Sequence, residues 1–243
     1  MIETANSIIQ LQEQIIMSTF DTFFFIIELI SITSFGISGA LAAIRKNLDV
    51  FGVVIIGVVT SIGGGIIRDL VLGIHPPKSF GNPIYAFVAA VCALGTFIIE
   101  YRHVKKRGKP NAMRQKIVDS IMFWLDSTGL AIFSVVGVAT AYELEHEYSM
   151  FLLCFVGTIT GVGGGLLRDT MINNMPYIFV KHFYASACII GSFVCAVLWN
   201  ILGRIPAMII GTVVIMILRF LAMYYHWNLP HVPNSDPDES PVR

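Results

Sequence analysis

Apolar residues occur in seven runs along the chain, and short polar stretches separate these runs. A helix needs about 20 mainly apolar residues to cross the roughly 30 Å of hydrocarbon in a bilayer, and each run is long enough, allowing for tilt. The pattern therefore predicts an all-α integral membrane protein with seven transmembrane helices. The runs cover residues 22–44, 50–74, 84–100, 117–141, 148–172, 179–202 and 206–227.

Composition supports a membrane protein and argues against other classes. The chain is 55% hydrophobic and 13% charged, with a mean hydropathy of +0.73, whereas soluble domains carry about 25% charged residues. Net charge is zero and the basic residues cluster between the runs, so nucleic acid is excluded as a partner. The four cysteines lie inside apolar runs without metal-ligand spacing and are interpreted as buried apolar residues.

The charges between the runs predict an orientation in the cell (inner) membrane. The loop 101–116 carries seven of the sixteen basic residues, and the positive-inside rule makes it cytoplasmic. Arg45 and Lys46 then also fall inside, the N-terminus lies outside and the C-terminus lies in the cytoplasm. Residues 1–21 have no Lys or Arg and form an N-terminal extracytoplasmic segment rather than a signal peptide. The polar, proline-rich tail 228–243 is predicted to be disordered.

An internal repeat divides the chain into 22–100 and 117–202, with the run 206–227 left over. The segment Thr60-Ser61-Ile62-Gly63-Gly64-Gly65-Ile66-Ile67-Arg68-Asp69 returns as Thr160-Gly161-Val162-Gly163-Gly164-Gly165-Leu166-Leu167-Arg168-Asp169, one hundred residues later. Upstream, Glu28, Phe35 and Gly39 match Asp126, Phe133 and Gly137 at an offset of 98. A tandem repeat of three spans must be inverted in the membrane, which is the usual plan of channels and transporters.

The triple glycines 63–65 and 163–165 predict a break in the second and fifth spans. Each glycine costs roughly 1 kcal/mol relative to alanine in a helix, so each run weakens its helix by about 3 kcal/mol. Backbone carbonyls freed in hydrocarbon must face protein, water or an ion, and a small cation is a suitable partner. The alternative interpretation is that the glycines only allow helices to pack closely.

Charged and hydroxyl side chains near the glycines are the remaining candidates for an ion path. Arg68-Asp69 and Arg168-Asp169 follow the glycines, and we expect each arginine to pair with the aspartate of the other repeat or with freed carbonyls. Anchoring at the membrane interface is the alternative. The matched acids Glu28 and Asp126 could flank a cation path and concentrate positive ions there. The alternative is that they mark helix ends near the lipid headgroups. Hydroxyls that could replace part of a hydration shell belong to Thr60, Ser61, Thr158 and Thr160.

No motif for catalysis or for a cofactor is found. The chain has no nucleophile elbow, phosphate loop or zinc-protease pattern, and its histidines lack ligand spacing. The sequence therefore predicts a protein that is not an enzyme and that binds no cofactor, and no metal beyond transient monovalent cations.

The two motifs Gly-Gly-Gly-Ile-Ile-Arg-Asp (63–69) and Gly-Gly-Gly-Leu-Leu-Arg-Asp (163–169), with Phe35 to Ala40 upstream, identify a family resemblance. Over residues 22–227 the chain resembles the bacterial branch of the trimeric intracellular cation (TRIC) channel family, also classed as a glycine transporter domain family. The resemblance implies a homotrimer with a hydrated, potassium-permeable pore in each protomer, lined where glycines kink the second and fifth helices. Animal members carry lysine-containing lipid-binding features after the glycines, and this chain has Ile-Ile-Arg-Asp and Leu-Leu-Arg-Asp there.

Three functions are compatible with this sequence. The first is a passive channel for monovalent cations, potassium before sodium, lined by the two triple glycines and the nearby hydroxyls. The second is a transporter of glycine or a similar zwitterion, in which helix amino ends bind the carboxylate and Asp69 or Asp169 binds the ammonium group. The third is a structural or regulatory membrane protein. The broken inverted repeat favours the first two, and only the resemblance separates them.

Overall fold

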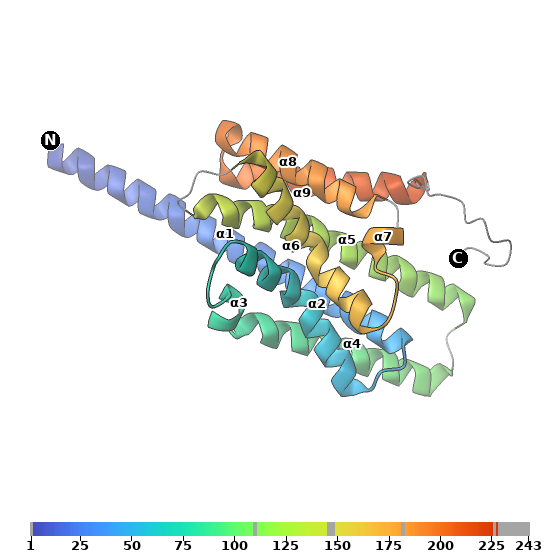
Figure 1. Ribbon diagram of the computed structural model, residues 1–243. Helices are drawn as coiled ribbons and strands as arrows, with labels where there is room; N and C mark the ends of the chain where they lie inside the picture. The colour runs from blue at the N-terminus through green and yellow to red at the C-terminus, as the bar shows by residue number, and fades with distance from the viewer. Residues whose placement is uncertain (1, 109–110, 145–148, 181–182, 226, 228–243) are drawn as a thin grey trace.

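The computed structural model of the protein describes residues 2–108, 111–144, 149–180, 183–225 and 227, and every regular element in these ranges is a helix (Figure 1). Among the described residues, seven helices are long and apolar enough to span a membrane: Met17–Arg45 of α1, and α2, α4, α5, α6, α8 and α9. This confirms the predicted number of spans. The helices are α1 (Ile2–Arg45), α2 (Val50–Val71), α3 (Lys78–Gly81), α4 (Ile84–Arg107), α5 (Ala112–Glu143), α6 (Met150–Met171), α7 (Tyr177–Val180), α8 (Tyr184–Leu202) and α9 (Arg204–Tyr224).

Matching polar residues begin the matching helices of the two repeats. The Asp49 carboxylate accepts a hydrogen bond from the Gly52 amide at 2.7 Å at the start of α2, and the Ser149 hydroxyl accepts one from Leu152 at 3.2 Å at the start of α6. Such side chains satisfy amide groups that have no partner inside the helix. The two caps are one hundred residues apart, so the repeat extends to the helix ends.

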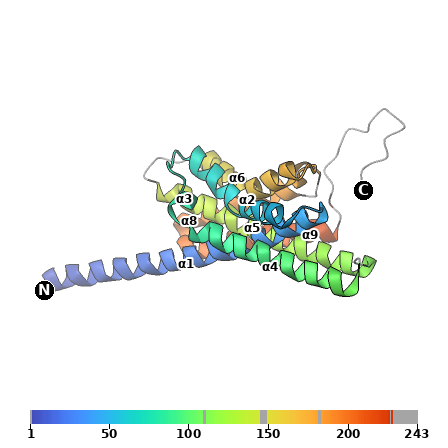
Figure 2. The same ribbon diagram turned by 90° about the horizontal axis from the view of Figure 1, so that it is seen from below.

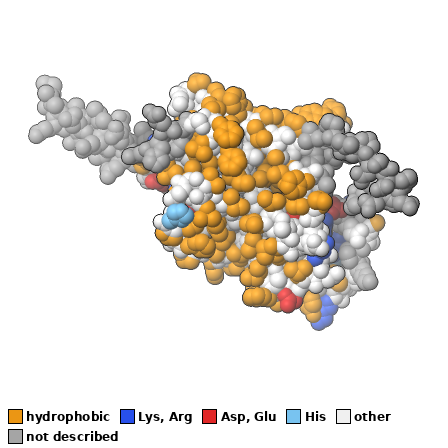
Figure 3. All heavy atoms as spheres, in the orientation of Figure 1, with side chains coloured by type: hydrophobic (Ala, Val, Ile, Leu, Met, Phe, Trp, Pro, Cys, Tyr) orange, Lys and Arg blue, Asp and Glu red, His pale blue; other side chains and the backbone are white. Residues whose placement is uncertain are grey.

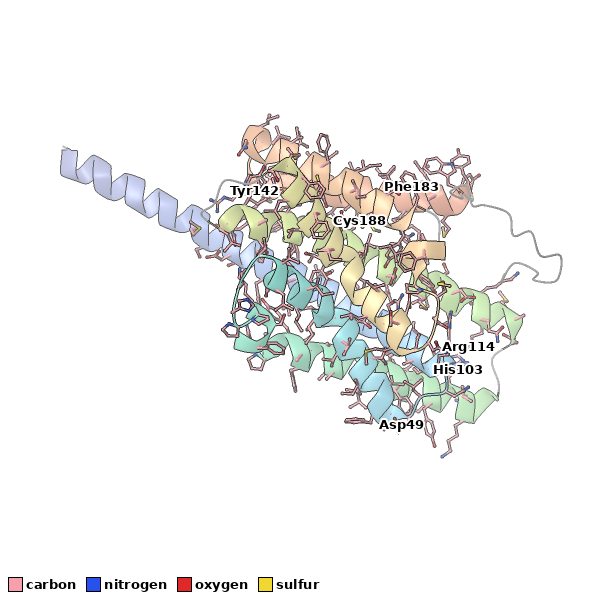
Figure 4. All side chains as sticks on the ribbon, in the orientation of Figure 1. Asp49, His103, Arg114, Tyr142, Phe183 and Cys188 are labelled. Carbon is pink, nitrogen blue, oxygen red and sulfur yellow. The ribbon has the colours of Figure 1, made fainter. Side chains whose placement is uncertain are left out.

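The two repeats are inverted relative to each other. At one end of the bundle, Tyr142 at the end of α5 stacks on Trp199 of α8 at 4.9 Å, and Phe20 of α1 contacts the same Trp199. At the other end, Arg45 at the end of α1 pairs with Asp119 in the first turns of α5 at 2.7 Å. Helices α1 and α5 are therefore antiparallel, and Figure 4 shows Tyr142 and Arg114 at opposite ends of the bundle.

Equivalent residues of the two repeats meet at the centre of the bundle. The rings of Phe35 and Phe133 are 5.6 Å apart, and the Ser31 hydroxyl donates a hydrogen bond to the Gly129 carbonyl at 2.8 Å. Both pairs join positions 98 residues apart. Helices α1, α2, α5 and α6 thus form a central group related by a pseudo-twofold axis. Helix α4 lies against α1 and α2, α8 lies against α5 and α6, and α9 lies against α5 and α8.

Several helices are longer than the apolar runs. Helix α1 begins at Ile2, so the predicted segment 1–21 is almost entirely helical, and the N-terminal part of α1 projects beyond the bundle (Figures 1 and 2). Helices α4 and α5 extend into the basic loop and leave 108–111 between them. The short helices α3 and α7 were not predicted. The predicted disordered tail 228–243 lies outside the described residues.

The prediction that the second and fifth spans are broken at the glycines is wrong. Helix α2 is continuous from Val50 to Val71 and α6 from Met150 to Met171, so Gly63–Gly65 and Gly163–Gly165 are helical. The roughly 3 kcal/mol lost to three glycines is offset by the backbone hydrogen bonds that a membrane-embedded helix must keep. The alternative interpretation, that the glycines allow helices to pack closely, agrees with the structure.

The outer surface fits a lipid environment. Orange apolar side chains cover most of the face in Figure 3, and the charged groups visible there lie toward its edges. On α4, the exposed large residues include Phe87, Val91, Ile98 and Ile99. The buried polar groups instead gather in the interior, where the candidate site lies.

Candidate ion pathway

A polar cavity of about 290 Å³ opens at the end of the bundle that carries α3. We call it the outer vestibule, where outer refers to the end of the helix bundle and not to a side of the membrane. Apolar residues of α1 and Phe133 of α5 form part of its wall, and Ser61 and Gly65 of α2 line it. Its charged and phenolic residues are Asp21, Glu28, Arg68, Lys78, Tyr85 and Glu143.

Three of these residues form a hydrogen-bonded and ionic cluster at the vestibule wall. Glu28 accepts a hydrogen bond from the Tyr85 hydroxyl at 2.7 Å, and its other carboxylate oxygen lies 3.8 Å from Arg68 Nη1. Glu28 is 9% exposed and Arg68 3% exposed. Since a charge in a low-dielectric interior needs a partner, the Arg68 guanidinium and the Tyr85 hydroxyl are placed where they would stabilise a negative charge on Glu28.

The second repeat contains a matching cluster that is more deeply buried. Arg168 Nη1 pairs with Asp126 Oδ1 at 2.7 Å and with the Ser38 hydroxyl at 3.1 Å, and the guanidinium lies 5.2 Å from the centre of the Tyr177 ring. Arg168 is fully buried and Asp126 is 1% exposed. Thus Glu28 and Asp126 each pair with the arginine of their own repeat. Both acids lie within their helices, so they do not mark helix ends at the membrane interface.

Each arginine also binds the aspartate that follows it, so the predicted pairing between repeats is wrong. The Nε of Arg68 donates to Asp69 Oδ1 at 2.8 Å, and Arg168 does the same to Asp169 at 2.8 Å. Although neighbouring residues point about 100° apart on a helix, the long arginine side chain folds back to reach the short aspartate. All four residues are buried, so the interfacial-anchor interpretation is also wrong.

The two aspartates hold the segments that follow α2 and α6. Asp69 Oδ2 accepts a hydrogen bond from the Lys78 amide at 2.7 Å, and Asp169 Oδ2 accepts one from the Tyr177 amide at 3.1 Å. These amides begin α3 and α7, where a negative group is favoured. The Arg-Asp motif therefore joins a buried carboxylate, its arginine and the returning chain into one unit in each repeat.

Helices α2 and α6 cross at the triple glycines with their backbones in contact. A Cβ atom added to Gly64 would overlap the Thr160 carbonyl oxygen, and one added to Gly164 would overlap the Thr60 carbonyl oxygen. The two contacts are equivalent under the pseudo-twofold axis. Only glycine fits at these positions, as at other close helix crossings in membranes.

The neighbouring glycines have different surroundings. A Cβ atom on Gly63 would lie 2.5 Å from Leu167, and one on Gly163 would lie 3.1 Å from the Gly64 backbone. The third glycine of each run faces a polar cluster instead, since the Cβ positions of Gly65 and Gly165 lie 3.8 Å from Nη2 of Arg68 and Arg168.

The candidate hydroxyl groups all donate hydrogen bonds within the protein. Thr60, Thr158 and Thr160 donate to carbonyls one turn earlier in their helices, at 2.6, 2.7 and 2.6 Å. The Ser61 hydroxyl lies 2.9 Å from the carbonyls of both Ile32 and Gly57. Of these four residues, Ser61 lines the outer vestibule. The oxygen of a hydroxyl that donates its hydrogen still has lone pairs, which can face a cation or accept a hydrogen bond from a ligand.

Sequence reasoning missed several polar residues that shape the site. Tyr85, Lys78, Asp21 and Glu143 line the vestibule. A signal existed for Tyr85, because Tyr85-Ala86 returns as Tyr184-Ala185 at the start of the corresponding helix α8. Across the described residues, no group of three or more metal-binding side chains occurs.

Comparison with known proteins identifies the family. The sequence profile described as Glycine transporter, which covers the TRIC family, matches residues 25–101 and 123–200, the two repeats. The chain belongs to the TRIC family. The UPF0126 inner membrane protein YadS of Escherichia coli K12 is 35% identical over 207 residues, covering 84% of this chain and 93% of YadS. A UPF0126 membrane protein of Vibrio cholerae is 32% identical, covering 85% of this chain and 81% of its own length.

Solved TRIC channels share the fold of this family member. A TRIC cation channel studied for its conductance is 36% identical, with a TM-score of 0.74 over 88% of this chain and 98% of its own. A prokaryotic TRIC channel crystallised in 0.5 M KCl is 29% identical, with a TM-score of 0.75 over 86% of this chain and 99% of its own. The TRIC orthologue of Rhodobacter sphaeroides is 28% identical, with a TM-score of 0.73 over 85% and 100%.

Proposed function

We propose that this protein is a membrane channel for monovalent cations, permeable to potassium, with an ion path inside each protomer. The observation that carries the proposal is the outer vestibule, which brings three acidic side chains to a buried polar cluster inside a seven-helix bundle. The likeness to TRIC cation channels supports conduction rather than catalysis.

The charges of the vestibule suit a cation. Asp21, Glu28 and Glu143 provide negative charge, and such groups raise the local concentration of cations at a pore entrance. Arg68 is held by Asp69 at 2.8 Å and faces Glu28, so its positive charge is largely compensated. Lys78 is the remaining cation of the vestibule.

From the vestibule the proposed path follows Ser61 and Gly65 to the crossing of α2 and α6, and then reaches Gly165 and the second cluster. Symmetry supports this route, because Gly65 and Gly165 face equivalent arginines on the two sides of the crossing. The narrow region is proposed to lie beside the contact of α2 and α6 at Gly63, Gly64, Gly163 and Gly164, next to the hydroxyls of Thr60, Thr158 and Thr160.

Orientation and assembly complete the proposal. The basic ends of α1, α4 and α5 are proposed to face the cytoplasm, so the N-terminus and the vestibule lie outside and the C-terminus inside. The relatives include a protein named as an inner membrane protein, which fits a bacterial inner membrane. We propose a homotrimer on the basis of the family resemblance.

Potassium flux in proteoliposomes tests the channel proposal, with Glu28→Gln as the diagnostic variant. The amide oxygen of glutamine still accepts the Tyr85 hydrogen bond, while the charge is lost. One charge about 5 Å from an ion contributes roughly 3 kcal/mol at an effective dielectric of 20. Because Arg68 screens part of this, we expect about a tenfold fall in flux.

Glu100→Gln is the matched control, because Glu100 pairs with Arg114 at 2.7 Å at the opposite end of the bundle, outside the vestibule. We expect its flux to equal that of the unmodified protein. Equal flux through both variants would show that the vestibule is not the ion entrance.

A second candidate function is transport of glycine or a similar zwitterion. The vestibule holds both signs of charge, so Arg68 or Lys78 could bind a carboxylate while Glu28 or Glu143 binds an ammonium group. Its volume of about 290 Å³ is near the lower limit of typical ligand pockets. Labelled glycine uptake, measured in the same vesicles, separates the two functions: saturable uptake without potassium conductance supports the transporter.

A further inference from the structure

The two polar clusters differ although their sequences match. In the first repeat, the Tyr85 hydroxyl donates to Glu28 at 2.7 Å. In the second repeat the acid is Asp126, which is shorter by one methylene group, and the equivalent tyrosine is Tyr184. Asp126 Oδ2 and the Tyr184 hydroxyl have no hydrogen-bond partner among the described residues, and neither has Arg168 Nη2. The second cluster is therefore not in its fully hydrogen-bonded arrangement.

Tyr184 fills the space beside the third glycine of the second repeat. Its hydroxyl lies 2.9 Å from the Cβ position of Gly165, whereas the nearest neighbour of the corresponding position at Gly65 is the Ser79 hydroxyl at 3.6 Å. Gly65 lines the open vestibule, but Tyr184 is 3% exposed. The equivalent place on the proposed ion path is thus open in the first repeat and closed by a phenol in the second.

An arginine of the unrepeated helix holds Tyr184 in this position. Arg219 of α9 is 4% exposed, and its guanidinium carbon lies 4.7 Å from the centre of the Tyr184 ring and 5.0 Å from that of Phe123. Its Nε donates to the Ser127 hydroxyl at 3.3 Å. Because α9 lies outside both repeats, the first repeat has no equivalent of this arginine.

We propose that Arg219 and Tyr184 form a gate in the inner half of the ion path, which is closed in this structure. This inference rests on the proposed channel function. Arg219 is the positioning residue and Tyr184 is the group that blocks the path at Gly165. In the open state the Tyr184 hydroxyl leaves Gly165 and donates a hydrogen bond to Asp126, as the Tyr85 hydroxyl does to Glu28. Because aspartate is shorter than glutamate by one carbon–carbon bond, the Tyr184 hydroxyl must move about 1.5 Å further to reach it.

The asymmetry of the repeats gives the gate its trigger. Movement of α9 away from α5 and α8 would withdraw the guanidinium from both aromatic rings. Tyr184 would then exchange an unpaired hydroxyl for a hydrogen bond to a carboxylate, which favours opening. The stacking of Arg219 opposes this exchange while α9 remains in place.

Potassium flux through an Arg219→Met variant tests the gate. Methionine keeps an apolar side chain in the site but removes the cation. Desolvated stacking of an arginine on an aromatic ring shifts an equilibrium by about tenfold or more, so we expect potassium flux in proteoliposomes to rise about tenfold. Arg204→Met is the control, since Arg204 is the exposed arginine of α9 and lies 5.3 Å from the Phe20 ring. We expect its flux to be unchanged.

A thiol readout separates the gate from the channel function. Cys188 lies one turn after Tyr184 on α8 (Figure 4), is fully buried and has its sulfur 3.5 Å from the Tyr184 carbonyl. With Cys92, Cys154 and Cys195 changed to alanine, a cationic methanethiosulfonate reagent can react only with Cys188. We expect about tenfold faster modification in Arg219→Met than in the parent.

The combined results are decisive. Faster modification of Cys188 without potassium flux in any variant would show that Arg219 keeps the Tyr184 site closed, but would refute the channel function on which the gate rests. Potassium flux in the parent, with neither flux nor modification changed by Arg219→Met, would refute the gate. If Arg219→Met does not fold, Arg219→Lys replaces it: the charge is kept, the planar stacking is lost, and an unchanged flux and modification rate would again overturn the gate.

Discussion

Gly64→Ala is the substitution that most sharply separates close packing from helix breaking. The new methyl group would overlap the backbone carbonyl of Thr160, which cannot rotate away as a side chain can. To reach an ordinary carbon–oxygen contact, α2 and α6 would have to separate by on the order of 1 Å at their crossing. Alanine improves helix propensity by about 1 kcal/mol, whereas overpacking costs about 1–3 kcal/mol and more where backbone must move. We expect a net loss of about 2 kcal/mol.

Gly65→Ala is the matched control within the same motif. Its Cβ would lie 3.6 Å from the Ser79 hydroxyl, an ordinary contact, so the gain in helix propensity is retained. The free energy of unfolding in detergent, measured by denaturant titration with circular dichroism, compares the two variants. We expect Gly65→Ala to be as stable as the unmodified protein or more stable, and Gly64→Ala to be less stable.

Equal stability of the two variants would refute this reasoning. It would mean that α2 and α6 are not in backbone contact at Gly64. If both variants were instead more stable by about 1 kcal/mol each, the glycines would act only by weakening the helix, as first expected from the sequence.

Two further predictions concern the buried clusters. Asp126→Asn breaks the fully buried pair with Arg168 and should lower the free energy of unfolding by about 3–5 kcal/mol. Asp119→Asn is the control: the Asp119 side chain is 61% exposed in its pair with Arg45, so the free energy of unfolding should change by less than about 1 kcal/mol. Similar losses for both variants would contradict the burial of the second cluster. Tyr85→Phe removes the hydrogen bond to Glu28 and should lower the free energy of unfolding, measured by denaturant titration, by about 1.5–3 kcal/mol. An unchanged free energy of unfolding would show that this hydrogen bond is not formed.

The spans and the repeat could be predicted from the sequence because both depend on local or directly repeated information. Hydrophobic length sets the seven spans, and the offset of one hundred residues between Gly64 and Gly164 relates two helices that cross each other. The helix ends do not follow from hydrophobicity. Polar residues such as those before Phe20 do not end a helix, so α1 extends far beyond its apolar run.

The glycine break could not be judged from helix propensity alone. Propensity counts the cost of Gly64 in an isolated helix, but not the contact that the missing side chain makes possible with Thr160. The pairing of Arg68 with Asp69 was missed for a related reason. Neighbouring Cβ atoms point in different directions on a helix, but the arginine side chain is long enough to reach the aspartate that follows it.

The difference between the repeats could not be seen from their similarity. A matched motif predicts two equivalent sites, yet the change from Glu28 to Asp126 leaves one tyrosine bonded to the acid and the other unbonded. Arg219 belongs to a helix outside the repeat, so no comparison of the two halves could reveal its contact with Tyr184.

The reversal potential of the purified protein in a planar bilayer, under a gradient of potassium chloride, tests the central claim most directly. An ion path with the acids Asp21, Glu28 and Glu143 at its entrance should select cations, so we predict a reversal potential close to the potassium equilibrium potential. A reversal potential near zero or near the chloride equilibrium potential, or an absence of current beside saturable glycine uptake in vesicles, would contradict the account.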